Sequence, residues 1–270
     1  MTDSESSRPL TLRDLAAMKQ RGEKIASLTC YDAAFAAVLD SAGVDVLLVG
    51  DSLGMTVQGR PTTLPVTLDA MAYHTACVDR GRRRAFLIAD LPFMSYQTFE
   101  QAGASAARLL QEGGAQMVKL EGGAHRADTI RHLAQEGVPV CAHLGLLPQS
   151  IHRLGGYRVQ GRGEADARRL LEDAVRLQDA GASLLVLECI PALLAEEITL
   201  QLDIPTIGIG AGGHCDGQVL VLQDVLGLTS GPVPRYCKNF LGGTGDIRTA
   251  IRAYVTAVRA GEYPAEEHCY

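Results

Sequence analysis

The chain has 270 residues, of which 47% are hydrophobic and 21% charged, a composition typical of a globular protein with enough apolar material for a core. Its 25 Lys and Arg against 31 Asp and Glu give a formal net charge of −6, so the chain has no general attraction to nucleic acid or anionic lipid. Disordered, collagen-like and membrane-spanning classes are excluded, since no apolar stretch approaches the ~18 residues of a spanning helix.

The first ten residues, MTDSESSRPL, lack the apolar segment of a signal peptide. We therefore predict a flexible N-terminal tail over 1–10 and a cytoplasmic location. The seven cysteines are an odd number, form no C-x-x-C pair and lie partly in apolar runs. This usage favours free, mostly buried thiols in a reducing compartment over a disulfide framework.

Short apolar runs recur along the chain and are nearly continuous, as expected for strands buried on both faces. They predict eight strands, at residues 24–30, 44–50, 84–90, 115–121, 138–144, 182–188, 204–210 and 218–224. Amphipathic helical patterns lie between most of them, at 31–42, 68–80, 98–113, 124–136, 164–180 and 192–202. Several helices precede a Gly, which readily takes the left-handed conformation just past a helix end.

This alternation predicts an α/β fold, a single (β/α)8 TIM-type barrel domain over residues 11–270. An additional N-terminal helix at 11–21 begins with Thr-x-x-Asp, a helix-start pattern, and we expect it to cover the barrel floor. An open doubly wound sheet is the alternative, because the link after the seventh predicted strand is short and glycine-rich.

Ionisable residues end five of the predicted strands, where a barrel carries its active site. They are Asp51, Asp90, Lys119, Glu121, His143 and Glu188. Any one of these acids alone is as readily explained as a helix cap or a loop carboxylate. Their recurrence on successive strands favours a common active site at one rim.

Asp51, Asp90 and Glu121 would place three carboxylates in one partly desolvated mouth, where they cannot all stay ionised without a cation. An oxygen-rich set with one nearby His and no Cys at ligand spacing favours a hard octahedral ion, Mg²⁺ first, with Mn²⁺ or Co²⁺ as substitutes. Glu188 lies one strand further away, a position that suits a general base beside the metal.

Lys119 has two roles that its spacing leaves open. It can neutralise a substrate carboxylate or an enolate oxygen, or it can form a Schiff base, as in a metal-free aldolase. Two further alternatives are a Mg²⁺ barrel enzyme that cleaves a C–C bond in a hydroxy acid, and a non-catalytic binding protein.

Two predicted connections, 51–67 and 146–163, are long for a compact barrel. Loops of this length are usually lids or binding loops, and both lie on the strand-end side. A basic run at 80–84 precedes the third predicted strand, which places it on the opposite floor. We interpret that run as a solvated face rather than a polyanion site.

At the strand ends the sequence resembles the ketopantoate hydroxymethyltransferase family. The matching stretches cover most of the chain, from about Leu28 to Leu241, and are LTCYDAAFA, LLVGDSLGMTVQGRPTTLPVTLDAMAYHT, ADLPFMSY, MVKLEGG, VCAHLGLLPQS, GGYRVQGRG, LLVLECIP, IGIGAG, DGQVLV and KNFL. The long block GDSLGMTVQG is far more specific than any short pattern. The resemblance implies transfer of a hydroxymethyl group from 5,10-methylenetetrahydrofolate to 3-methyl-2-oxobutanoate, giving 2-dehydropantoate for pantothenate synthesis.

Carried over by residue, the resemblance implies that Asp51 and Asp90 bind Mg²⁺ directly and that Glu121 binds it through water. Glu188 is implied as the proton acceptor. A Mg²⁺-stabilised enolate of the keto acid would then attack the one-carbon unit of the folate.

The resemblance also implies that Ser52, Lys119 and His143 contact the keto acid, together with Asp51 and Asp90 around the metal. In that setting Lys119 is a charge partner rather than a Schiff base. Family membership further implies a large homo-oligomer, typically a decamer, whose partners are the keto acid and the folate.

Overall fold

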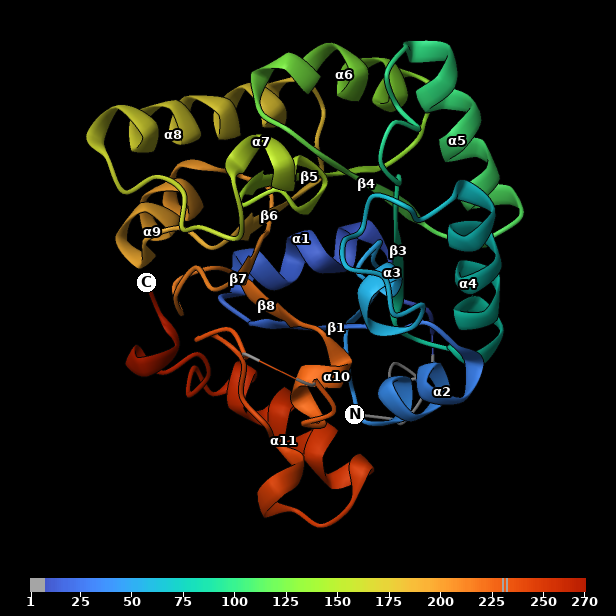
Figure 1. Cartoon of the computed structure of the whole chain (residues 1–270), viewed down its shortest axis with the longest axis vertical. Coiled ribbons are helices and arrows are strands. Elements are labelled where there is room, and N and C mark those ends of the chain that lie inside the picture. The colour runs from blue at the N-terminus through green and yellow to red at the C-terminus, as the bar shows by residue number, and fades with distance from the viewer. Residues whose placement is uncertain (1–7, 230, 232) are drawn as a thin grey trace.

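The structure is a computed structural model that describes residues 8–229, 231 and 233–270. Its eight strands form one closed parallel barrel in chain order, as Figure 1 shows. The strands are β1 (Ile25–Thr29), β2 (Val46–Val49), β3 (Phe86–Asp90), β4 (Met117–Glu121), β5 (Val140–Gly145), β6 (Leu184–Glu188), β7 (Thr206–Ile209) and β8 (Gly217–Leu220). Because β1 pairs with β8, the sheet has no edge, so the barrel prediction is confirmed and the open sheet is wrong.

Helices surround the barrel (Figure 1). The longer ones are α1 (Leu12–Arg21), α2 (Ala33–Ser41), α4 (Leu68–Gly81), α5 (Phe99–Gln111), α6 (Ala127–Gln135), α8 (Glu164–Asp179), α9 (Ala192–Gln201) and α11 (Ile247–Arg259). Short helical turns are α3 (Leu53–Thr56), η2 (Ala124–Arg126), η3 (Pro148–Ser150), α7 (Ile151–Leu154), α10 (Leu222–Val225), η4 (Leu241–Gly243) and η5 (Glu266–His268). Side chains of Asp32, Thr67 and Thr98 accept backbone N–H groups at the starts of α2, α4 and α5, which explains where these helices begin.

Two elements differ from the sequence-based expectation. The apolar run 218–224 leaves the sheet after Leu220, and residues 222–225 form α10, whose first backbone N–H donates to the Thr29 hydroxyl at 3.0 Å. Helix α11 was not predicted, although the Asp246 side chain caps it by accepting the Thr249 N–H at 3.0 Å. Its Tyr254 hydroxyl donates to a backbone oxygen of β1 and to one of β8. Helix α11 therefore packs over the two strands whose pairing closes the barrel.

Helix α1 lies across the floor of the barrel, as predicted. The Leu10 N–H before it donates to the Arg84 oxygen at 2.7 Å, just ahead of β3. Near its other end, Lys19 Nζ lies 2.8 Å from Asp216 Oδ2, just ahead of β8. Of the predicted tail, residues 1–7 lie outside the described residues, whereas Leu10 is held against the barrel.

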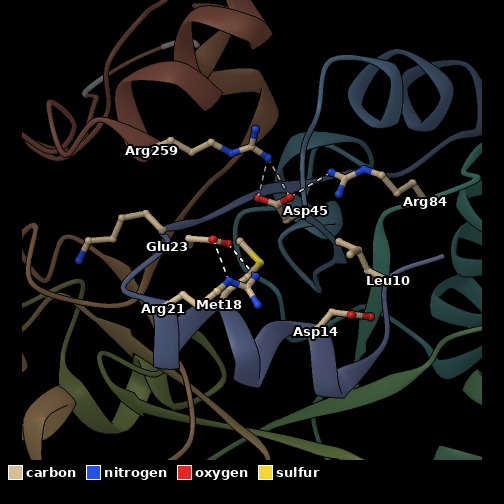
Figure 2. Close-up of a pocket in the computed structure, with 9 residues that line it drawn as sticks. Leu10, Asp14, Met18, Arg21, Glu23, Asp45, Arg84 and Arg259 are labelled. Atoms are coloured by element: carbon tan, nitrogen blue, oxygen red, sulfur yellow. Dashed lines mark hydrogen bonds and ion pairs between the residues drawn. The ribbon is translucent and has the colours of Figure 1, made fainter. Parts of the chain in front are cut away.

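The floor carries a buried carboxylate between two arginines, shown in Figure 2. Asp45 is 2% exposed, and its oxygens lie 3.0 Å from an Arg84 nitrogen and 2.9 Å from an Arg259 nitrogen. Asp45 also accepts the Ala26 N–H at 3.1 Å, which joins the starts of β1 and β2. A cavity of about 440 Å³ adjoins this group. It lies at the amino-terminal ends of the strands, opposite the carboxyl-terminal ends that carry the predicted site residues.

The basic run 80–84 is only partly a solvated face. Arg80 and Arg83 are exposed, as expected. For Arg82 and Arg84 that interpretation is wrong, because both side chains are half-buried. Arg82 pairs with Asp79 and donates to the Ala85 oxygen, and Arg84 pairs with Asp45. Their charges are used to fix the floor of the barrel.

All seven thiols are free, and four of them are buried: Cys30, Cys141, Cys189 and Cys215. This confirms the expectation of buried thiols without disulfides. None of the helices in the described part of the chain combines the length and the apolar character that crossing a membrane requires.

Candidate active site

The ionisable side chains predicted from the strand ends meet at the carboxyl-terminal rim of the barrel. The strand register places Asp90 beside Lys119 and Glu121 beside His143. Five of the six residues are buried to 5% exposure or less: Asp51, Asp90, Lys119, Glu121 and His143. The Glu188 side chain is 13% exposed, which makes it the member of the group most open to solvent.

A buried ion pair joins β3 to β4. Lys119 Nζ lies 2.8 Å from Asp90 Oδ1, and both side chains are almost fully buried. The second oxygen of Asp90 accepts the backbone N–H of Asp51 at 3.0 Å, just after β2. Asp90 therefore links the ends of three neighbouring strands.

Gln149 is a site residue that the sequence analysis did not single out. Its amide Nε2 donates to Asp51 Oδ2 at 2.9 Å and to the Leu91 oxygen at 3.0 Å. Its backbone N–H donates to Glu121 Oε2 at 3.0 Å. The Tyr96 hydroxyl donates to its Oε1, so every polar group of the Gln149 side chain is used. Its sequence signals were its place in the long connection after β5 and in the matching stretch VCAHLGLLPQS.

Burial and mutual repulsion disfavour ionisation of the carboxylates. Burial raises the pKa of Asp51 to about 7, and the nearby charge of Asp90 adds to the effect. The pKa of Glu121 is raised well above its usual range by burial and by Asp51. These carboxyl groups would be stabilised as anions by a cation placed among them.

His143 lies between the ion pair and Glu188. Its Nδ1 is 3.4 Å from Lys119 Nζ and 3.6 Å from Glu121 Oε1, and its Nε2 is 3.2 Å from Glu188 Oε2. Burial and the positive charge of Lys119 lower the pKa of His143 well below its usual range. The imidazole is therefore neutral at physiological pH, and within the described part of the chain its Nε2 has no partner in hydrogen-bond geometry.

Glu188 is held at the rim by the backbone around it. Gly145 at the end of β5 has φ +95, and a Cβ there would lie 2.1 Å from the backbone carbonyl oxygen of Glu188. Cys189 follows with φ 47, a left-handed conformation uncommon outside glycine, and its N–H donates to the Ile209 oxygen. Burial raises the pKa of Glu188 to about 7, against the opposing effect of Lys119.

Ser52 follows Asp51 and lies at the edge of the same group. Its hydroxyl is 2.8 Å from the hydroxyl of Tyr31, a buried residue just after β1. A Cβ on Gly50 would lie 2.8 Å from the Ser52 oxygen and 3.5 Å from Asp90 Oδ2. Glycine at position 50 therefore leaves room for Ser52 beside the carboxylates.

The residues present suit a Mg²⁺ ion. Among the residues that the structure describes, no three side chains of His, Cys, Asp or Glu are arranged as a complete metal site. Mg²⁺ rarely needs three, since it usually keeps several waters and takes one or two protein carboxylates plus substrate oxygens. Asp51 and Asp90 are two adjoining buried carboxylates whose hard oxygen atoms match that preference.

The two long connections meet above this rim, on the side predicted for them. The Tyr157 hydroxyl of the second connection donates to the Met55 sulfur of the first at 3.4 Å. Both side chains are otherwise exposed. The pKa of Tyr157 is raised by partial burial and by the charges of Glu188 and Asp51.

Comparisons with known proteins agree with the resemblance. The 3-methyl-2-oxobutanoate hydroxymethyltransferase of Methylococcus capsulatus is 63% identical over 262 residues, 97% of each chain. That of Alkalilimnicola ehrlichii is 57% identical over 266 residues, 98% of this chain and 96% of the relative. The solved phosphoenolpyruvate phosphomutase of Streptomyces platensis shares the fold, with a TM-score of 0.61 at 12% identity over 81% of this chain and 83% of that one.

The family model described as ketopantoate hydroxymethyltransferase matches residues 9–266, which include every strand of the barrel and every rim residue discussed above. The chain belongs to the ketopantoate hydroxymethyltransferase family.

Proposed function

We propose that this protein transfers a hydroxymethyl group from 5,10-methylenetetrahydrofolate to 3-methyl-2-oxobutanoate, forming 2-dehydropantoate for pantothenate synthesis. Family membership supports the reaction class. The observation that carries the mechanism is the position of Glu188, a partly exposed carboxylate next to neutral His143 and across the rim from Asp51 and Asp90.

The keto acid would bind with its two adjacent oxygen-bearing groups toward Asp51 and Asp90. Mg²⁺ held by these two residues would supply positive charge to stabilise the negative charge that develops on the 2-oxo oxygen. Glu121 would complete the site through a water molecule. Lys119 would add a second positive charge, and Ser52 would hold the substrate carboxylate by hydrogen bonding.

Glu188 would take the proton from C3 of the keto acid. A pKa near 7 makes the carboxylate a stronger base than an exposed glutamate, while leaving a large share of it ionised at neutral pH. Neutral His143, whose Nε2 lies 3.2 Å from Glu188 Oε2, would pack against the base without pairing its charge. The resulting carbanion would bond to the one-carbon unit as its two bonds to the folate nitrogens break. Water would supply the oxygen of the new hydroxymethyl group, and tetrahydrofolate would leave with the nitrogens protonated.

The Schiff-base alternative is disfavoured by the surroundings of Lys119. Although burial acts in the opposite direction, the charges of Asp90, Glu121 and Asp51 raise the pKa of its ammonium above the usual range. A Schiff base needs the neutral amine, which a lysine gains when its pKa is lowered. Lys119 is thus better suited to act as a fixed positive charge.

The test is hydrogen exchange at C3 of 3-methyl-2-oxobutanoate in D₂O, followed by NMR. We expect exchange in the presence of Mg²⁺, loss of exchange in EDTA, and product only when the folate donor is added. Glu188→Gln serves as the matched variant, since it removes the base and keeps the shape.

Each other outcome favours a different function. Exchange that survives EDTA and a protein trapped by borohydride would favour Lys119 and a Schiff base. Metal-dependent exchange without folate-dependent product would favour a C–C bond-cleaving enzyme that acts on a hydroxy acid. Tight keto-acid binding with no exchange or product under any condition would favour a binding protein.

A further inference from the structure

A second cavity lies on the rim side of the barrel, next to the candidate active site. It has a volume of about 350 Å³ and is bounded by the turn after β3, the segment after β4, the connection after β5 and the middle of α8. We call it the arginine cavity and define it by Glu121, Phe93, Met94, Leu147, Arg126 and Arg153. Glu121 and Gln149 line it as well as the carboxylate cluster, so the two spaces share a wall.

Positive charge gathers in the arginine cavity. The Arg126 guanidinium lies over the ring of Tyr96, 4.6 Å from the ring centroid. Its Nη1 donates to the backbone carbonyl oxygen of Tyr96. The Nε of Arg126 is buried and has no hydrogen-bond acceptor among the residues that the structure describes. Arg153 is exposed on α7 and lines the same cavity as Arg126 and His125.

Among the residues that line the cavity, three arginines face two acids, Glu121 and Asp173. Asp173 is engaged by the backbone, since it accepts the Ala124 N–H at 3.1 Å. Arg169, a further lining residue, already pairs with Asp166 at 3.0 Å. Glu121 lies at the inner end, beside the reacting groups. The cavity thus has an acidic inner end and a basic outer end.

Apolar side chains form the wall between these two ends. Phe93 and Met94 are 41% and 49% exposed, although they are large apolar residues at a cavity. Met94 has φ 64, a left-handed conformation, and its oxygen accepts hydrogen bonds from the amides of Gln97 and Gln101. Two side-chain hydrogen bonds thereby hold this turn in a costly conformation that leaves both side chains uncovered.

We propose that the arginine cavity binds the folate donor, with its ring system against Phe93, Met94 and Leu147 and its glutamate carboxylates at Arg126 and Arg153. This assignment rests on the proposed function. The one-carbon end must reach the keto acid, which places it toward Glu121, and the carboxylates need cations, which places them at the outer end. A volume of about 350 Å³ is within the ~300–1,000 Å³ of small-molecule sites.

The test measures tetrahydrofolate affinity by calorimetry with the full chain, Mg²⁺ and keto acid present. We expect Arg153→Ala and Arg126→Gln each to weaken tetrahydrofolate binding by about tenfold, the usual effect of losing a charge-assisted hydrogen bond. Arg168→Ala is the matched control, because Arg168 is a neighbouring exposed arginine that pairs with Glu164 and does not line the cavity. That variant should bind like the wild type.

Tetrahydropteroate, which lacks the glutamate, is the second probe. It should bind the wild type and both cavity variants equally, because the deleted charges have no carboxylate to contact. Equal losses for both probes, or unchanged tetrahydrofolate affinity in both cavity variants, would overturn the assignment. Failure of the proposed function is distinguishable, since the wild type would then show neither exchange at C3 of the keto acid nor transfer from the folate.

Discussion

The Nε2 of His143 lies 3.2 Å from Oε2 of Glu188, at the point where β5 and β6 reach the rim of the barrel. The histidine is fully enclosed and neutral, whereas the glutamate retains access to solvent. A neutral neighbour does not neutralise the carboxylate by ion pairing, so Glu188 keeps the basicity that its burial creates.

Replacement of that carboxylate by an amide is expected to stop proton transfer. We predict that Glu188→Gln lowers turnover by about 10²-fold or more, the usual contribution of a general base, while Mg²⁺ and keto-acid binding persist. Steady-state kinetics and calorimetry on the same preparation check this. Turnover near that of the wild type would remove Glu188 from the role.

The same substitution is expected to stabilise the metal-free protein at high pH. The folded-state pKa of Glu188 is raised from 4.5 to about 7, so its favourable contribution is present below pH 4.5 and is lost as the pH rises through about 7. At pH 8, Glu188→Gln should exceed the wild type by up to about 3 kcal/mol in unfolding free energy, and the gap should shrink toward pH 5. Urea unfolding in EDTA at the two pH values measures it; a gap independent of pH would contradict the shift.

Loss of either proposed metal ligand should weaken Mg²⁺ binding. Asp51→Ala and Asp90→Ala each remove one of two adjoining buried carboxylates. Asp69→Ala is the control, since that carboxylate is 82% exposed and pairs with Arg108 far from the rim carboxylates. Calorimetric titration of Mg²⁺ checks the prediction, and unchanged affinity in both rim variants would exclude this pair as the ligands.

Gln149 is expected to affect the metal through Asp51. Without the amide, Asp51 Oδ2 loses its 2.9 Å donor and is free to turn away from Asp90. Groups that orient a metal ligand typically contribute about 10-fold or more to metal affinity, so Gln149→Ala should raise the Mg²⁺ dissociation constant by roughly that factor. Tyr96→Phe removes the hydrogen bond to Gln149 Oε1 and the long 3.4 Å bond from the Glu121 N–H but keeps the Gln149 amide, so it should have a smaller effect. If both variants bind Mg²⁺ normally, Gln149 does not position the ligand.

The floor should control stability without affecting the chemistry. Asp45→Ala leaves Arg84 and Arg259 without their shared carboxylate. Because these guanidinium groups keep some contact with water, we expect a loss of about 2 to 3 kcal/mol, at the low end for a broken buried pair. Urea unfolding measures the loss, and turnover at 20 °C should equal that of the wild type. A drop in turnover of the folded variant would contradict the separation.

Hydrophobic periodicity predicted the barrel well, because strands buried on both faces are short, apolar and easily separated from amphipathic helices. It failed where local signals compete. Residues 222–225 continue an apolar run, but tertiary contacts turn them into α10. The helix at 247–259 carried its own start signal in Asp246, which the sequence analysis did not use.

The rim acids were found because each one ends a predicted strand, and parallel strands bring their ends together. Gln149 and Tyr96 lie in connections, where no periodicity indicates which side chains return to the rim. The arginine cavity was also invisible from the sequence, since Arg126 and Arg153 come from different connections. The metal, the folate contacts and the oligomer stay predictions.

Asp45 with its two arginines lies at the opposite end of the barrel from Glu188. Substitutions that change stability and substitutions that change the reaction can therefore occur in separate parts of the molecule. Substitutions around Arg84 and Arg259 can adapt the enzyme to heat or cold without passing through forms that have lost turnover. A library selected for thermal tolerance should therefore collect its changes at the floor. A library selected for a different keto acid should collect them among the connections above the rim.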